Sequence, residues 1–420
     1  MDEMIMEVPN REYIELTFAK ETATGKGLNQ RFVMENLHDG LMKITEGRIG
    51  ITIGVNKPKS FTLPMEEWDK VYSKKIALGY ILFATEKMET KKIVKQSQSI
   101  GGVHFKPLQD TAVARIIQKL IGYTNQLMEQ QYTVKVENIS EDMLKRGEAI
   151  LDELAASYKT MSVPEFNNKL KVLFAVIPRR IDNLSKKLAK RTADFQDIVA
   201  QEQELFDVMV SQIKGIEVEK NSSDKTILEG YGLEWREVTP DEEKWIRKKM
   251  GPEGARYVNA WRITNKMTED RFNAFCKKEN LSDGHGVERL FHGSRSENFW
   301  SIITTGLTIN PKNVVITGKM FGNGTYFAPD ACKSMGYTDR SGSRWANGTA
   351  STGFLGIYKV AVGNPAAPQS AGSYTWTNLK SKGYHSVWCK RGGSIGLRMD
   401  EVVVYQDCQD TIEYLVEVGM

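Results

Sequence analysis

The spacing of apolar residues changes twice along this chain of 420 residues, and this limits the folds it can adopt. In the first hundred residues apolar and polar side chains alternate, which is typical of strands with one buried face. From about residue 106 the apolar residues recur at helical spacing, and after about residue 225 short strand-like runs return. Because one core rarely serves so long a chain, the patterns predict three domains, residues 1–105, 106–220 and 225–420.

Residues 1–105 alternate in two stretches. The apolar members are Ile14, Leu16 and Phe18 in the first and Ile49, Ile51 and Ile53 in the second. In the first stretch the residues expected on the solvent face are Tyr13, Glu15 and Thr17. After Pro64, one helical face holds Met65, Trp68, Val71, Tyr72 and Ile76. We therefore expect a small twisted sheet with one helix packed on it.

Residues 106–220 show three helical signals. A long apolar stripe consists of Val113, Ile116, Ile117, Leu120, Thr124, Leu127 and Met128. Ser162 and Glu165 form a capping-box pattern before a second helix, which Pro178 ends. A last helix carries Ile198, Leu205, Phe206, Met209 and Ile213. A helical bundle of about one hundred residues is expected, followed by a polar linker over residues 220–225.

Residues 225–420 predict an α+β domain. The runs 354–362, 401–405 and 413–416 suit an antiparallel sheet. No G-x-G-x-x-G motif follows a strand, which argues against a doubly wound dinucleotide fold. We therefore expect a split β core, and an α+β multidomain protein for the whole chain.

Composition excludes several classes of protein. There is no apolar run long enough to cross a membrane and no signal peptide at the N-terminus, so an intracellular protein is expected. The four cysteines are scattered, with no C-x-x-C pair and no histidine at ligand spacing, which argues against a zinc site or a disulfide framework. A net charge of +4 permits contact with nucleic acid without requiring it.

Three short motifs carry the candidate chemistry: residues 290–294 (LFHGS), 324–328 (GTYFA) and 400–405 (DEVVVY). They set His292, Tyr326 and Glu401 on strand-like segments among small or apolar residues. Alone, a His-Gly-Ser turn, a core tyrosine or a surface glutamate would be unremarkable. Together the motifs resemble the catalytic signature of the ADP-ribosyltransferases, in particular the poly(ADP-ribose) polymerase family.

The resemblance implies a role for each motif residue toward NAD. Glu401 matches the catalytic glutamate, and Lys333 the lysine beside it. His292 matches the histidine that binds the adenosine ribose, Gly293 the residue whose backbone pairs with the nicotinamide carboxamide, and Ser294 continues this motif at the ribose edge. The nicotinamide-binding set that the resemblance adds is Tyr326 and Tyr337, which stack on the ring, and Ser334, which binds the carboxamide.

The other two segments resemble parts of the same family. The stretch from Glu46 to Arg48 resembles the core of the WGR domain, which implies DNA contact through Arg48 and Lys57. Glu46 stands where the family has tryptophan, and a carboxylate repels phosphate where an aromatic ring would stack. Residues 106–110 and 175–178 resemble the regulatory helical domain, which in the family restrains access to NAD.

Two loops depart from the family. The segment 306–324 resembles the donor loop, but Thr308 stands where many members have arginine and Lys319 where they have tyrosine. Residues 382–387 resemble the segment before the acceptor-side loop, and that loop is short here, which predicts shorter or less branched polymer.

The resemblance implies an NAD-dependent protein ADP-ribosyltransferase. NAD would be its substrate, without a metal, and its acceptors would be proteins, including the chain itself, and the growing poly(ADP-ribose). Broken DNA would be a further partner in a DNA-damage response and DNA repair. No membrane partner is expected, and the location would be the nucleus in a eukaryote and otherwise the cytoplasm. Two alternatives stay open: mono-ADP-ribosyl transfer, and an inactive protein that binds DNA ends or chromatin.

Overall fold

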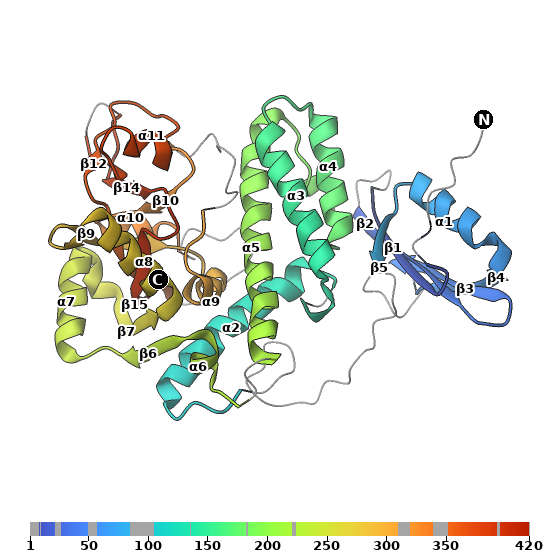
Figure 1. Ribbon diagram of the computed structural model, residues 1–420, viewed down its shortest axis with the longest axis horizontal. Helices are drawn as coiled ribbons and strands as arrows, with labels where there is room; N and C mark the ends of the chain where they lie inside the picture. Colours follow the sequence, from blue (N-terminus) through green and yellow to red (C-terminus); the bar gives the residue numbers. More distant parts are fainter. Residues whose placement is uncertain are drawn as a thin grey trace. The chain divides into compact units, whose positions relative to one another are not determined.

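The computed structural model describes residues 8, 10–21, 27–48, 57–84, 105–134, 136–181, 184–220, 224–309, 320–338, 352–392 and 395–419. The chain divides into two compact units. The first unit comprises Met1–Val94 and Met128–Phe206, and the second comprises Lys95–Leu127 and Asp207–Met420. Figure 1 shows the helices and strands of both.

The first unit contains an antiparallel sheet, which has five strands among the described residues. In spatial order they are β4 (Lys59–Pro64), β3 (Leu41–Arg48), β2 (Gly27–Asn36), β1 (Tyr13–Glu21) and β5 (Ile81–Ala84). A short 3-10 turn, η1 (Met65–Glu67), leads into α1 (Trp68–Ala77). Trp68 and Tyr72 of α1 are buried against Ile14 and Leu16 of β1. The predicted sheet with one packed helix is confirmed, while residues 49–56, including the second alternating stretch, lie outside the described residues.

The prediction that β1 has one solvent face is wrong. Tyr13, Glu15 and Thr17 are buried like their apolar neighbours, and Thr17 is only 1% exposed. Its hydroxyl donates a 2.6 Å hydrogen bond to the carbonyl of Ala175 in α4 (Val163–Val176), and Glu15 pairs with Arg31 at 2.6 Å. Alternation of apolar and polar residues indicates a solvent-exposed face only when the polar side chains have no partners within the protein. Tyr13, Glu15 and Thr17 do have such partners.

The remaining elements of the first unit are helical. They are η2 (Val136–Asn138), α3 (Glu141–Ser157), α4, η3 (Leu184–Lys186) and η4 (Thr192–Asp194). Ser162 caps α4 in the predicted capping box with Glu165, and α4 ends two residues before Pro178. Helices α3 and α4 lie side by side (Figure 1).

Two long helices are divided between the units. These are α2 (Thr111–Gln131) and α5 (Phe195–Lys220). The apolar stripe of α2 is buried along its whole length, as predicted. Lys220, expected in a linker, is the last residue of α5, and residues 221–223 lie outside the described part of the chain.

The second unit has the predicted split β core. Its described strands form a larger sheet in the order β6 (Leu233–Glu237), β7 (Tyr257–Asn265), β15 (Asp410–Gly419), β11 (Thr352–Ala361), β9 (Gly286–Gly293) and β8 (Ser282–Asp283). A smaller sheet has the order β10 (Thr325–Phe327), β14 (Glu401–Val404), β13 (Ser386–Cys389) and β12 (Pro365–Ala366). Only the short pairs β8 with β9 and β12 with β13 are parallel among the described strands.

Short helices flank these sheets. They are α6 (Ile227–Tyr231), α7 (Pro240–Met250), η5 (Gly251–Arg256), α8 (Lys266–Glu279), α9 (Ser296–Thr305), α10 (Ala331–Met335) and α11 (Trp376–Lys380). The α+β class is therefore observed for the second unit.

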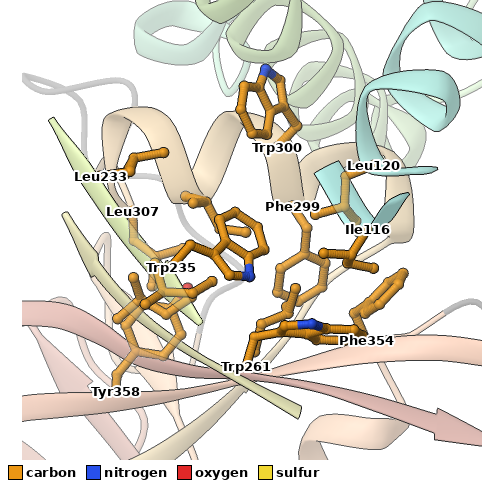
Figure 2. Close-up of a cluster of buried hydrophobic side chains, with 14 of the residues drawn as sticks. Ile116, Leu120, Leu233, Trp235, Trp261, Phe299, Trp300, Leu307, Phe354 and Tyr358 are labelled. Atoms are coloured by element: carbon orange, nitrogen blue, oxygen red, sulfur yellow. The ribbon is translucent and has the colours of Figure 1, made fainter. Parts of the chain in front are cut away.

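The first half of α2 belongs to the core of the second unit. Ile116 and Leu120 pack in one buried cluster with Trp261, Phe299 and Phe354 (Figure 2). On the polar side of the helix, Nζ of Lys119 donates to Oε1 of Glu417 at 2.5 Å. The Thr352 hydroxyl accepts from the same Nζ and donates to the same carboxylate. Residues expected only in a separate helical bundle thus contribute to this core.

Candidate active site

His292 and Tyr326 are brought together where β9 meets β10. Phe291 and Ala328 exchange two backbone hydrogen bonds, of 2.8 and 2.9 Å, which join the two segments. Next to this bridge, Nδ1 of His292 donates to the carbonyl oxygen of Tyr326 at 2.9 Å. Because a carbonyl only accepts, Nδ1 carries the proton, and the imidazole ring is held in one orientation.

Glu401 lies on the same face of the smaller sheet as Tyr326. Strands β10 and β14 are antiparallel, with Tyr326 opposite Val403, so these two side chains point to the same face. Glu401 precedes Val403 by two residues and therefore shares that face. Burial raises the pKa of Tyr326, and the nearby charge of Glu401 adds to this effect. The pKa of Tyr337 is also raised, by partial burial and by the charge of Glu401, although the side chain as a whole is 63% exposed.

The strand that carries Glu401 is enclosed on both sides. Val402 and Val404 belong to the core cluster of the second unit that also contains the α2 residues, and Val403 packs on the opposite face with Phe321 and Tyr405. All three valines are fully buried. Glu401 is thus anchored at the start of a strand that has little freedom to move.

Lys333 of α10 forms an ion pair with Glu401. Its Nζ lies 2.8 Å from Oε1 of Glu401, and the two side chains are only 14% and 12% exposed. The same Nζ donates to the main-chain carbonyl of Asp400 at 3.3 Å. An ion pair this well enclosed is weakly screened by water, and removal of one partner leaves a buried charge.

Gly293 is required by a contact within the protein. A Cβ atom at this position would lie 1.8 Å from the carbonyl oxygen of Ser334 in α10. The Ser334 hydroxyl donates to the carbonyl of Phe291 at 3.1 Å, which fastens α10 to β9 at the same point. The backbone of α10 therefore excludes every larger residue at this position.

Two tyrosine hydroxyls hold the turn before β10. Tyr326 donates to the carbonyl of Gly322 at 2.9 Å and accepts from the backbone N–H of Phe321 at 3.1 Å. Tyr405 donates to the carbonyl of Phe321 at 2.6 Å. Tyr337, by contrast, is 63% exposed, so its ring is available at the surface near Glu401.

Ser294 and the two loop positions that depart from the family lie in different surroundings. Ser294 accepts a 3.0 Å hydrogen bond from Nδ2 of Asn298 at the start of α9. Thr308 is exposed, while residues 310–319, including Lys319, lie outside the described residues.

The candidate DNA residues belong to the first unit. Arg48 ends β3 and Lys57 precedes β4, and because Glu46 is opposite Lys59, both lie at the same end of this strand pair. Glu46 pairs with Lys75 at 3.2 Å, and Lys75 in turn lies 3.9 Å from the centre of the Phe32 ring. Lys75 therefore offsets the negative charge of Glu46.

Sequence reasoning treated Asp400 only as part of a motif. Its carboxylate accepts hydrogen bonds from Nε1 of Trp388 at 2.9 Å and from the backbone N–H of Arg391 at 2.8 Å. No spacing rule links these residues, since the pairing of β13 with β14 brings them together.

Within the described part of the chain, no group of His, Cys, Asp or Glu side chains is arranged to hold a metal ion. None of the described helices has the length and apolar character needed to span a membrane.

Comparison with known proteins identifies the family. Residues 243–393 match the model of the poly(ADP-ribose) polymerase catalytic domain, and this match ends before Glu401. The putative poly [ADP-ribose] polymerase-like protein 100L of Invertebrate iridescent virus 6 is 31% identical over 159 residues, covering 36% of this chain and 79% of that protein. The uncharacterized protein 101L of the same virus is 27% identical over 151 residues, covering 36% of this chain and 60% of that protein.

A longer and more distant match extends toward the N-terminus. Poly [ADP-ribose] polymerase 1 of Danio rerio is 23% identical over 406 residues, which cover 86% of this chain and 38% of that protein. The chain thus spans less than two thirds of protein 101L and of the fish enzyme. The catalytic-domain match and the identity with protein 100L place the chain in the poly(ADP-ribose) polymerase family.

Proposed function

We propose that this protein transfers ADP-ribose from NAD to protein acceptors, with Glu401 as the catalytic residue. The observation that carries the proposal is the Glu401–Lys333 ion pair beside Tyr326, whose backbone in turn holds His292. Three motifs distant in sequence thus meet in one place, and this place lies within or next to the matched catalytic region.

The chemistry needs a fixed negative charge beside a sugar. When nicotinamide leaves NAD, the attached ribose passes through an oxocarbenium-like state with positive charge. Nicotinamide leaves as a neutral ring, so no acid is needed for its departure. A carboxylate held in a place with little water stabilises the developing cation and polarises the incoming acceptor hydroxyl. Lys333 keeps the Glu401 carboxylate oriented, since it bonds both this side chain and the preceding backbone carbonyl.

The other motif residues would bind NAD. In this proposal His292 binds the adenosine ribose, the Gly293 backbone and the Ser334 hydroxyl bind the carboxamide, and Ser294 lies at the ribose edge. Tyr326 and Tyr337 would enclose the cationic nicotinamide ring, which suits aromatic faces. The exposure of Tyr337 supports its role, because a ring that closes over a ligand must be reachable before the ligand binds.

Release of nicotinamide from NAD by the purified chain tests the proposal. We expect steady release by the wild type and none above background by Glu401→Gln. Release from the wild type that is no faster than spontaneous NAD hydrolysis would favour the alternative of an inactive binding protein.

We further propose that the product is poly(ADP-ribose), since the retained glutamate can also activate the ribose hydroxyl of a growing chain. Labelled NAD and a denaturing gel test this: a ladder is expected, and a single modified band would indicate mono-ADP-ribosyl transfer.

We also propose a role in a DNA-damage response, with Arg48 and Lys57 contacting broken DNA in a nucleus. It depends on the resemblance of residues 1–105 to the WGR domain. Nicotinamide release with and without nicked DNA tests it, and equal rates would contradict it.

A further inference from the structure

The Asp400 side chain joins the two ends of the connection between β13 and β14 by hydrogen bonds. This connection leaves β13 at Cys389 and returns at Glu401, and these two residues are paired across the strands. Oδ2 of Asp400 accepts the indole N–H of Trp388 at 2.9 Å, and Oδ1 accepts the N–H of Arg391 at 2.8 Å. Nζ of Lys390 lies 3.2 Å from Oδ2. One carboxylate thus ties the end of the connection to its beginning.

The backbone of Asp400 makes a second link, toward Glu401. Its carbonyl oxygen accepts from Nζ of Lys333 at 3.3 Å, and the same Nζ lies 2.8 Å from the Glu401 carboxylate. Adjacent Cα atoms are about 3.8 Å apart across a trans peptide, so a displacement of residue 400 is transmitted directly to residue 401. The carbonyl that Lys333 holds would move with it.

We propose that Asp400 is a positioning residue for ADP-ribose transfer. Its carboxylate holds the start of β14 so that Glu401 and Lys333 stay in register with the reacting ribose. The inference rests on the proposed function, because it assumes that Glu401 acts on NAD. Reacting groups must be held to within about 0.5 Å, and a misplacement of about 1 Å costs on the order of a hundredfold in rate.

The bonds of Asp400 differ in their importance. The Lys390 side chain is 66% exposed, and exposed ion pairs contribute little. The indole N–H of Trp388 and the backbone N–H of Arg391 are directional donors to a side chain that is only 19% exposed. We therefore assign the positioning effect to these two hydrogen bonds rather than to the charge of Lys390.

The test uses the full chain and measures nicotinamide release against NAD concentration, so that kcat and KM are obtained separately. For Asp400→Ala we expect kcat to fall by about tenfold to a hundredfold, with KM for NAD within about threefold of the wild type. Asp400→Asn keeps an oxygen for the N–H of Arg391 but places an amide near the indole donor, so partial rescue of kcat is expected. Trp388→Phe removes only the indole donor and is expected to fall between Asp400→Ala and the wild type.

Controls separate this inference from general damage and from the proposed function. Glu243→Gln removes a carboxylate from an exposed i,i+4 pair with Arg247 and is expected to leave both constants unchanged. If Asp400→Ala does not fold, Trp388→Phe alone decides. A normal kcat in folded Asp400→Ala or Trp388→Phe, alongside an inactive Glu401→Gln, would overturn the positioning role and leave the proposed function intact. Absence of activity in the wild type would instead overturn the proposed function.

Discussion

The hydroxyl of Thr124, in α2, donates a 2.8 Å hydrogen bond to the main-chain carbonyl of Glu297 at the start of α9. Both groups are buried, and the bond lies within the second unit, which also carries Glu401. The first half of α2 is therefore part of the folded second unit, and its removal would destabilise that unit.

Leu120→Ala is expected to destabilise the second unit. Leu120 is fully buried among aromatic side chains, and truncation of such a residue costs about 2–5 kcal/mol. Thermal or denaturant unfolding measures the loss. Leu78→Ala, at a position 57% exposed, is the matched control and is expected to change the free energy of unfolding by less than about 0.5 kcal/mol. Equal effects of the two substitutions would contradict the placement of α2 in this core.

Deletion of residues 106–220 is expected to yield a poorly folded protein, because it removes Val113, Ile116 and Leu120 from the core. Replacement of residues 128–206 by a flexible linker keeps the parts of α2 and α5 that belong to the second unit. If these helices restrain the site as in the resembled family, the second deletion should raise basal nicotinamide release. Unchanged or lower release by a well-folded protein would argue against restraint.

Glu401→Gln is expected to lower kcat for nicotinamide release by at least about a hundredfold, which is the usual cost of losing one preorganised electrostatic contact. NAD affinity, measured by calorimetry, should change little, because the other motif residues would bind NAD. The substitution also leaves Lys333 without its anionic partner, so a lower melting temperature is expected. The double variant Glu401→Gln, Lys333→Met removes both charges and should regain part of that stability while staying inactive.

Gly293→Ala is expected to disrupt the contact between β9 and α10. Its methyl group would meet a backbone oxygen at 1.8 Å, which neither element can relieve by rotation of a side chain. Loss of NAD binding and of several kcal/mol of stability, about 3 or more, is expected. Gly122→Ala in α2 is the control, since the added carbon would lie more than 4 Å from every described atom outside its own stretch of helix backbone, and a gain of about 0.5–1 kcal/mol is expected there. A stable Gly293→Ala variant that binds NAD would refute the assigned contact.

Asp410 should make stability depend on pH. Burial raises the pKa of the Asp410 carboxyl well above its ordinary value, and the negative charge of Asp407 adds to this effect. Oδ2 of Asp410 has no hydrogen-bond partner among the described residues. Because the folded protein binds this proton more tightly than the unfolded chain, stability is lost as pH rises from the ordinary pKa of aspartate toward the raised one.

The variant Asp410→Asn has no proton to lose. Relative to the wild type it should therefore become more stable as pH rises from 4 to 8, and each tenfold difference in proton affinity corresponds to about 1.4 kcal/mol. Unfolding in denaturant at several pH values measures this, with the exposed Asp270→Asn as control. A constant difference between Asp410→Asn and the wild type across this range would contradict the prediction.

Local signals in the sequence predicted local structure well. The capping box at Ser162 and the stripe of α2 depend on residues three or four positions apart, so the chain itself reveals them. The buried polar face of β1 could not be recognised, because the partner of Thr17 lies 158 residues away in α4. The membership of α2 in two units was hidden for the same reason, since an apolar stripe does not say what will cover it.

The candidate site was predicted only through family resemblance. His292, Tyr326, Lys333 and Glu401 follow no shared spacing rule, and strand pairing brings them together. The hydrogen bonds of Asp400 and the contact of Gly293 with Ser334 could not be predicted from the sequence. They join segments whose separation along the chain follows no pattern.

The enclosure of Val402, Val403 and Val404 has a consequence for inhibitor design. Because core clusters pack against both faces of β14, the strand cannot shift to accommodate a compound that reaches Glu401. Room for a bulky substituent is therefore expected toward Tyr337, whose side chain is 63% exposed.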